Sequence, residues 1–148
     1  FQFYIHMLTL TKIFHFEMAH AIHGYSGACK NVHGHSYELH VKVSAAVNDE
    51  AFIPAPGFLI DFKEIKKIVT ELIVQKFDHH LLLSEDFLKL NPAYLIAENL
   101  IKFEAEPTAE NLLLYIRNIL NEKFPKNIGL THLKLFETTD SYAEWANI

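Results

Sequence analysis

The chain has 148 residues, half of them hydrophobic, and a formal net charge of −5. This length and composition predict one domain with a sizeable core. The charge argues against nucleic acid as a partner, and no apolar run is long enough to predict a membrane span. The single cysteine excludes an internal disulfide and fits a reducing cytoplasm. We expect residues 7–148 to form that domain and residues 1–6 to be an extension or a cloning remnant.

The first predicted strand covers residues 8–20, in which apolar and polar side chains alternate. Its apolar positions share one parity with His20, which therefore ends the buried face of a half-buried strand. Residues 21–31 have the glycine and serine content of a loop. A second strand follows, in which the apolar side chains from Tyr37 onward continue the parity of His33 and His35. Because the loop joins neighbouring ends of an antiparallel pair, the parity predicts that the three histidines converge.

The rest of the chain predicts two helices and two more strands. Asp61 and Glu64 form a capping box, so a helix should run from there to about Lys76. A second long helix is expected from Pro107-Thr108 to about Phe124. Residues 87–106 have no clear pattern, although residues 93–103 favour a short helix.

Two further strands are expected at the end of the chain. Residues 130–137 show a blurred alternation, and residues 142–147 complete a last short strand. The predicted order ββααββ is α+β: a four-stranded antiparallel sheet with two long helices on one face. Such a sheet has two open edges, which favours symmetric oligomerisation.

Three converging imidazoles predict a zinc site formed by His20, His33 and His35, whose fourth position stays open for water or substrate. The alternative for His33 and His35 is that they are ordinary strand residues. Cys29 precedes His33 by four residues. It fits a buried structural thiol, a reactive thiolate beside the metal, or a fourth zinc ligand, and spacing alone does not separate the last two.

Two further acidic positions have candidate roles. Asp78 next to His79 is the arrangement of many acid–base pairs, although it is also common in surface turns. Glu137 lies in an apolar strand, where a buried carboxylate needs hydrogen-bond donors such as the amino group and ring N–H of a ligand. The alternative is a glutamate exposed on an edge strand.

Taken together, these residues resemble the 6-pyruvoyltetrahydropterin synthase / 6-carboxytetrahydropterin synthase family from about Phe14 to Trp145. The resemblance rests on motifs in the family's order, of which the most specific is Cys29-x-x-x-His33-Gly34-His35. The others are Phe16-Glu17-Met18-Ala19-His20, Leu59-Ile60-Asp61-Phe62, Phe77-Asp78-His79, Pro107-Thr108-Ala109-Glu110-Asn111 and Phe136-Glu137-Thr138.

The resemblance implies the T-fold, in which two stacked trimers form a hexamer with sites between subunits. It implies zinc on the three histidines, Cys29 as the catalytic base, and assistance from Asp78 and His79. Glu137 would hold the pterin ring, with Thr108 and Glu110 close to it.

The implied substrate is 7,8-dihydroneopterin triphosphate. The first expectation is conversion to 6-carboxy-5,6,7,8-tetrahydropterin with release of acetaldehyde and triphosphate, a step toward queuosine and related deazapurines. The alternative is elimination of triphosphate by a 6-pyruvoyltetrahydropterin synthase of biopterin synthesis. A third expectation, from a different class, is a non-catalytic zinc- or pterin-binding module. Two departures from the family pattern affect the choice of substrate: the apolar Leu82-Leu83 after the Asp-His motif, and the long segment Phe87 to Glu106.

Overall fold

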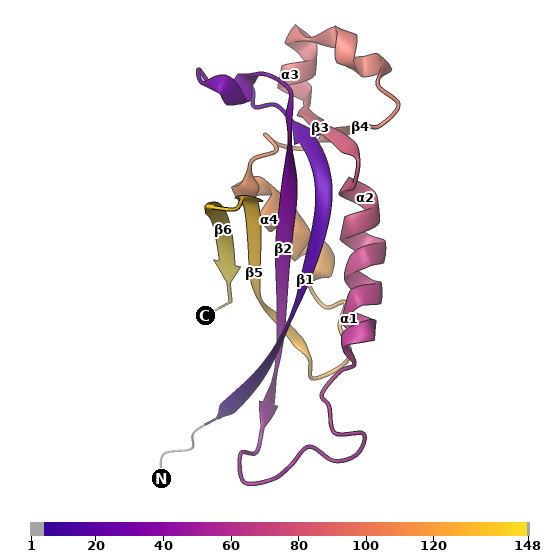
Figure 1. Ribbon diagram of the computed structural model, residues 1–148, viewed down its shortest axis with the longest axis vertical. Helices are drawn as coiled ribbons and strands as arrows, with labels where there is room; N and C mark the ends of the chain where they lie inside the picture. Colours follow the sequence, from indigo (N-terminus) through magenta and orange to yellow (C-terminus); the bar gives the residue numbers. More distant parts are fainter. Residues whose placement is uncertain (1–4, 148) are drawn as a thin grey trace.

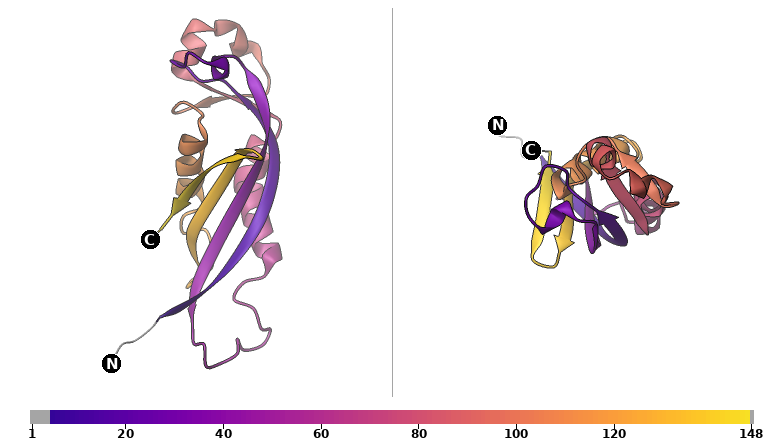
Figure 2. Two further views of the ribbon diagram at one scale, coloured as in Figure 1. Left: turned by 60° about the vertical axis from the view of Figure 1, so that its left-hand side comes forward. Right: turned by 90° about the horizontal axis from the view of Figure 1, so that it is seen from above.

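A curved, mixed sheet with helices against one face makes up the described part of the chain (Figures 1 and 2). The computed structural model describes residues 5–147. The six strands lie in the order β4-β3-β1-β2-β5-β6. In chain order, the elements are β1 (His6–His20), η1 (Ala28–Lys30), β2 (His33–Val47), α1 (Phe62–Val69), η2 (Thr70–Val74), α2 (Gln75–Phe77), β3 (His80–Ser84), α3 (Glu85–Leu90), η3 (Pro92–Ile96), β4 (Leu100–Phe103), α4 (Ala109–Leu120), β5 (Gly129–Thr138) and β6 (Ser141–Ala146).

The long hairpin of β1 and β2 is the centre of the sheet. Its register runs without interruption from His6 paired with Val47 to His20 paired with His33. The buried side chains are those that the alternation predicts, namely Phe14, Phe16, Met18 and His20 on β1 and Tyr37, Leu39, Val41, Val43 and Ala45 on β2. Of the predicted extension, residues 1–4 lie outside the described residues, and His6 is the first residue of β1.

The prediction of a four-stranded antiparallel sheet is wrong, because β3 and β4 add two parallel strands beside β1. Residues 81–83 of β3 are all leucine and all buried. A parallel strand is covered on both faces, so its sequence is continuously apolar and lacks the alternation that marks a half-buried strand. For the same reason the order ββααββ fails, and the segment expected as a helix at 93–103 contains η3 and β4 instead.

A core truncation in β3 tests this buried strand. Leu82→Ala removes a fully buried side chain and should lower the free energy of unfolding by about 2–5 kcal/mol. The matched control is Leu90→Ala, because Leu90 is 72% exposed and its loss should cost no more than about 0.5 kcal/mol. Urea unfolding of both variants checks the difference, and equal stabilities would contradict the placement of Leu82 in the core.

The first helical segment is continuous through α1, η2 and α2 and packs against β1 (Figure 1). Asp61 caps it, since its carboxylate accepts the Lys63 N–H at 2.8 Å. Ile65, Val69 and Ile73 are buried, and Phe77 continues their spacing of four, whereas Lys76 is exposed. The π-helical turn η2 favours this wider spacing, because it adds a residue to the turn.

The second long helix, α4, packs against β5 and β6. Thr108 caps it by accepting the Asn111 N–H at 3.2 Å, so its predicted start is confirmed, but it ends at Leu120 rather than near Phe124. No helix among residues 5–147 is long and apolar enough to span a bilayer.

A bulge accounts for the blurred alternation in β5. The register against β2 shifts between Lys42 and Val43, which leaves Thr131 as an extra residue on β5. Leu130 and Leu133 therefore both face the core although three positions separate them. The Thr131 hydroxyl lies 2.7 Å from that of Ser44, which explains how this serine is buried on a polar position of β2.

Candidate metal centre and adjoining cavities

Three imidazoles meet at one end of the β1–β2 hairpin. His20 is the last residue of β1, and His33 and His35 open β2. One ring nitrogen of each lies within 4.8 Å of those of the other two, and the Nε2 atoms of His20 and His33 are 3.1 Å apart. The convergence predicted from strand parity is therefore present, and the cluster has the composition of a metal site.

Backbone carbonyls orient two of the three rings. The His20 Nδ1–H donates to Pro107 O at 2.7 Å, and the His33 Nδ1–H donates to Asn31 O at 2.7 Å. A carbonyl can only accept, so each Nδ1 carries the proton and each Nε2 keeps a free lone pair. Hydrogen bonds of this kind fix the tautomer of metal-ligating histidines.

The third ring and the electrostatics of the cluster also fit a metal ion. His35 Nε2 is buried and makes no hydrogen bond among the described residues, although it lies 3.4 Å from Glu137 Oε1. Burial lowers the pKa of His20 and of His35 below the ordinary value for histidine. Both rings are thus held in the neutral form that binds metals, and a cation would satisfy the unpaired nitrogen.

A cavity of about 200 Å³ opens beside the histidines. It brings together most of the residues singled out in the sequence, since its lining contains His20, Cys29, Thr108, Glu110 and Glu137. The other lining residues of this cavity, which the sequence did not predict, are Ile22, Tyr25 and Ala109. Two of these lie in the loop before Cys29, where no periodicity marks the side chains that point inward.

Cys29 lies on η1 within that loop and is half-buried. Its sulfur does not belong to the group of ligand atoms that lie within 4.8 Å of one another. Two bonds fix the loop: the Ile22 N–H donates to Cys29 O at 2.8 Å, and the His23 N–H donates to Glu106 Oε1 at 2.7 Å. The thiol therefore faces the cavity beside the metal cluster and is not a member of it.

Glu137 lies at a second irregularity of β5, where the register against β6 shifts between Phe136 and Thr138. Its side chain is 27% exposed and contributes to the cavity next to His35. The alternative of an edge-strand glutamate in open solvent does not describe this position. A carboxylate here can accept hydrogen bonds from a ligand in the cavity.

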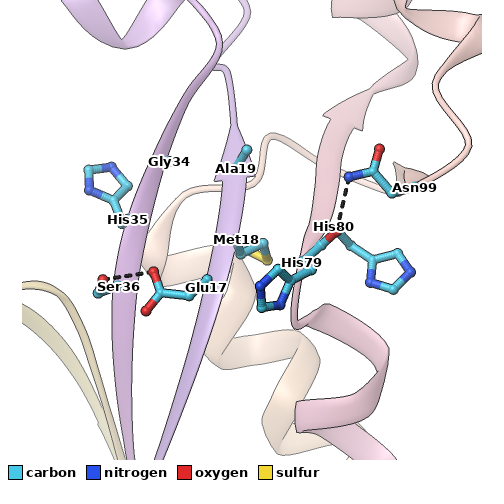
Figure 3. Close-up of a pocket in the computed structure, with 9 residues that line it drawn as sticks. All are labelled: Glu17, Met18, Ala19, Gly34, His35, Ser36, His79, His80 and Asn99. Atoms are coloured by element: carbon cyan, nitrogen blue, oxygen red, sulfur yellow. Dashed lines mark hydrogen bonds between the residues drawn. The ribbon is translucent and has the colours of Figure 1, made fainter.

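Asp78 and His79 lie elsewhere in the same chain. Figure 3 shows His79 at a cavity of about 390 Å³, whose lining also includes Glu17, Ser36 and Asn99. Glu17 and Ser36 have the opposite parity to the metal cluster, so they project from the other face of the hairpin. Among the described residues, this cavity and the one beside Cys29 have no lining residue in common, although His35 of the metal cluster also lines the larger cavity.

Hydrogen bonds hold the Asp78–His79 pair to β1. Asp78 Oδ1 accepts the Glu17 N–H at 2.9 Å and lies 3.0 Å from His79 Nδ1. The Glu17 N–H, and after it His79, hold the pKa of Asp78 below its ordinary value. The His79 side chain is 78% exposed, so the pair presents an oriented imidazole to the outside of the chain.

The lowered pKa of Asp78 predicts a pH-dependent contribution to stability. The ionised carboxylate stabilises the fold above its unfolded-state pKa of about 3.9, and this contribution is lost as the pH falls through the lower folded-state value. Asp78→Asn should therefore lower the free energy of unfolding at pH 7 by less than about 1 kcal/mol, since the carboxyl is partly exposed.

Urea unfolding at pH 7 and pH 3.5 checks this, with Asp140→Asn in the exposed β5–β6 turn as the control. A difference between wild type and Asp78→Asn that grew toward pH 3.5 would contradict the assignment.

Comparison with known proteins places these features in a family. The sequence profile described as "6-pyruvoyl tetrahydropterin synthase" matches residues 9–147. The chain is 31% identical to a 6-carboxy-5,6,7,8-tetrahydropterin synthase of Rickettsia typhi over 93% of this chain and 99% of the relative. It is 29% identical to the Haemophilus influenzae protein of the same name, over 94% and 99% of the two chains.

Among solved structures, the 6-pyruvoyl tetrahydropterin synthase of Caenorhabditis elegans has the same fold. The TM-score is 0.67 at 20% identity, over 99% of this chain and 100% of that one. The profile match extends over nearly the whole chain, and it includes both the three histidines and the residues of the two cavities. The chain belongs to the 6-pyruvoyl tetrahydropterin synthase family.

Proposed function

We propose that the protein converts 7,8-dihydroneopterin triphosphate to 6-carboxy-5,6,7,8-tetrahydropterin, with release of acetaldehyde and triphosphate. The observation that carries the proposal is the three-histidine cluster beside a cavity lined by Cys29, Thr108, Glu110 and Glu137. The names of the relatives from Rickettsia typhi and Haemophilus influenzae support the carboxy-forming reaction. The product would enter queuosine and related deazapurine synthesis in the cytoplasm, and residues 7–148 would act as a single domain.

The metal is proposed to be zinc, held by His20, His33 and His35. Tetrahedral zinc with bonds of 2.0–2.1 Å places ligand nitrogens about 3.3 Å apart, close to the 3.1 Å between the Nε2 atoms of His20 and His33. When bound, the ion supplies a Lewis acid that acidifies the hydroxyls and the adjacent C–H of the substrate side chain. The Pro107 and Asn31 carbonyls keep the His20 and His33 rings in the tautomer with the proton on Nδ1, which leaves each Nε2 free to bind the metal.

The residues around the cavity bind the substrate and move its proton. Glu137 accepts hydrogen bonds from the amino group and ring N–H of the pterin, and Thr108 and Glu110 line the same space at the start of α4. Cys29, half-buried beside the metal cluster, takes a proton from the substrate side chain as the catalytic base.

The Asp78–His79 pair is proposed to act in the site of a neighbouring subunit. The imidazole is exposed, and it lines a different cavity from the one beside Cys29. Asp78 orients this ring and stabilises its protonated form, which relays a second proton. The uncovered edges of the sheet, β4 and β6, support assembly with other copies, which we propose is a hexamer made of two trimers.

Product analysis tests the proposal. The purified protein, loaded with zinc, is incubated with 7,8-dihydroneopterin triphosphate, and acetaldehyde and pterin products are measured. Release of acetaldehyde in proportion to 6-carboxytetrahydropterin is the expected result. Triphosphate release with 6-pyruvoyltetrahydropterin and no acetaldehyde would replace the proposal by the pyruvoyl-forming reaction. Absence of any turnover at full zinc occupancy would favour a non-catalytic binding module.

A further inference from the structure

We propose that Asn99 is a positioning residue that fixes the direction of the His79 imidazole. This inference rests on the proposed function, because it assigns a purpose to Asn99 only if His79 takes part in the reaction. Asn99 lies immediately before β4, in the long segment 87–106 for which the sequence suggested no role. Its effect passes through the backbone of His79, since its side chain bonds to the carbonyl of that residue.

His79 has an unusual backbone conformation. Its φ is +62°, in the left-handed region that a residue with a Cβ seldom occupies. Such a conformation is strained and persists only where the surroundings impose it. Here the chain passes directly from the C-terminal end of α2 into β3, which begins at His80. The backbone conformation of His79, together with the 3.0 Å contact of its Nδ1 with Asp78 Oδ1, therefore sets where the imidazole points.

Two hydrogen bonds hold the peptide groups of His79 on either side. The His79 N–H donates to Glu17 O at 2.6 Å, and the Asn99 side-chain Nδ2–H donates to His79 O at 2.9 Å (Figure 3). The first partner is the backbone carbonyl of Glu17 in β1, which is present whichever side chain stands at position 17. The second is a side chain, so it is the part of this arrangement that a substitution can remove.

Asn99 is itself firmly placed. Its own carbonyl accepts the Leu81 N–H at 3.0 Å, and the next residue, Leu100, pairs with Leu81 in the parallel ladder of β3 and β4. The amide of Asn99 is thus built into the start of β4 and faces the peptide that follows His79. Without its donor, the His79 carbonyl loses this side-chain partner, and the left-handed conformation keeps only the backbone bond to Glu17 and the pairing of His80 with Met18.

The test compares Asn99→Ala and the isosteric Asn99→Asp, which lacks the Nδ2–H donor, with Asn91→Ala. Asn91 is a matched control, because its Nδ2–H also donates to a backbone carbonyl, Phe87 O at 3.0 Å, but its side chain lies outside the lining of the cavity at His79. Both Asn99 variants should lower kcat by about 10- to 100-fold with KM and zinc content unchanged, as expected for a displaced catalytic group. The control should keep wild-type kcat.

A second measurement separates positioning from a general structural role. In a His79→Ala background, Asn99→Ala should cause no further loss of the residual turnover, because there is no imidazole left to direct. An equal loss in both backgrounds would overturn the inference, and so would wild-type kcat in the Asn99 variants while His79→Ala is inactive. Full activity of His79→Ala would instead remove the role of His79 in the proposed function.

Discussion

Cys29→Ala is expected to lower kcat by about 10²- to 10⁴-fold while the zinc content stays at the wild-type level. The reason is that the candidate metal cluster and the cavity that holds the thiol are neighbouring but separate parts of the site. The three candidate ligand nitrogens come from His20, His33 and His35, whereas the thiol lies in the cavity beside them. Initial rates of acetaldehyde release and zinc per subunit by atomic absorption measure the two properties on the same preparation.

The control for this variant is Ser26→Ala, an exposed side chain in the same loop, which should keep both turnover and zinc. Loss of zinc together with turnover in Cys29→Ala would mean that the sulfur is a ligand. Wild-type turnover in Cys29→Ala would contradict its role as the base and, with it, the proposed mechanism.

Mixing two inactive variants is expected to restore activity. If Cys29 of one subunit meets His79 of the next, assemblies formed from equal amounts of Cys29→Ala and His79→Ala subunits contain intact sites. A site is intact when its first subunit keeps the cysteine and its second keeps the histidine, so random mixing restores about a quarter of wild-type turnover. The structural reason for this expectation is that Cys29 and His79 line two different cavities of one chain, which have no lining residue in common within its described part.

The experiment requires the two variants to be unfolded and refolded together, with turnover compared at equal total protein. Cys29→Ala mixed with the double variant Cys29→Ala/His79→Ala is the matched control, because no combination of these subunits has both groups. Activity no higher than this control would show that each site is formed within a single chain.

The alternation of apolar and polar residues was sufficient to predict the strands that have one buried face. The parity of β1 and β2 predicted the convergence of His20, His33 and His35, because a hydrophobic pattern of period two fixes both face and register. Likewise, Asp61 and Thr108 marked the starts of the helical segments, since a cap bonds to backbone N–H groups a few residues away. These features depend on contacts that are local or on an uninterrupted ladder.

The sequence was a poor guide where the decisive contacts are distant. Three consecutive buried leucines have no period, so β3 was not distinguished from an apolar loop, and β4 depends on β3 for its pairing. The burial of Phe77 next to an exposed Lys76 follows a π-helical turn that no residue type marks. Whether Asp78–His79 and Cys29 share a cavity depends on the face of the hairpin on which each cavity opens.

The strand β1 links two groups of residues that we propose to act in different reaction centres. Its backbone at Glu17 holds Asp78 and His79, and three residues later its last residue, His20, belongs to the candidate metal cluster. Met18 lies between them, paired with His35 on one side and with His80 on the other. In the proposed assembly, a displacement of this strand would therefore move the candidate metal ligand of one centre and the candidate proton relay of the next together. A substitution that shifts β1 is then expected to alter both half-sites at once.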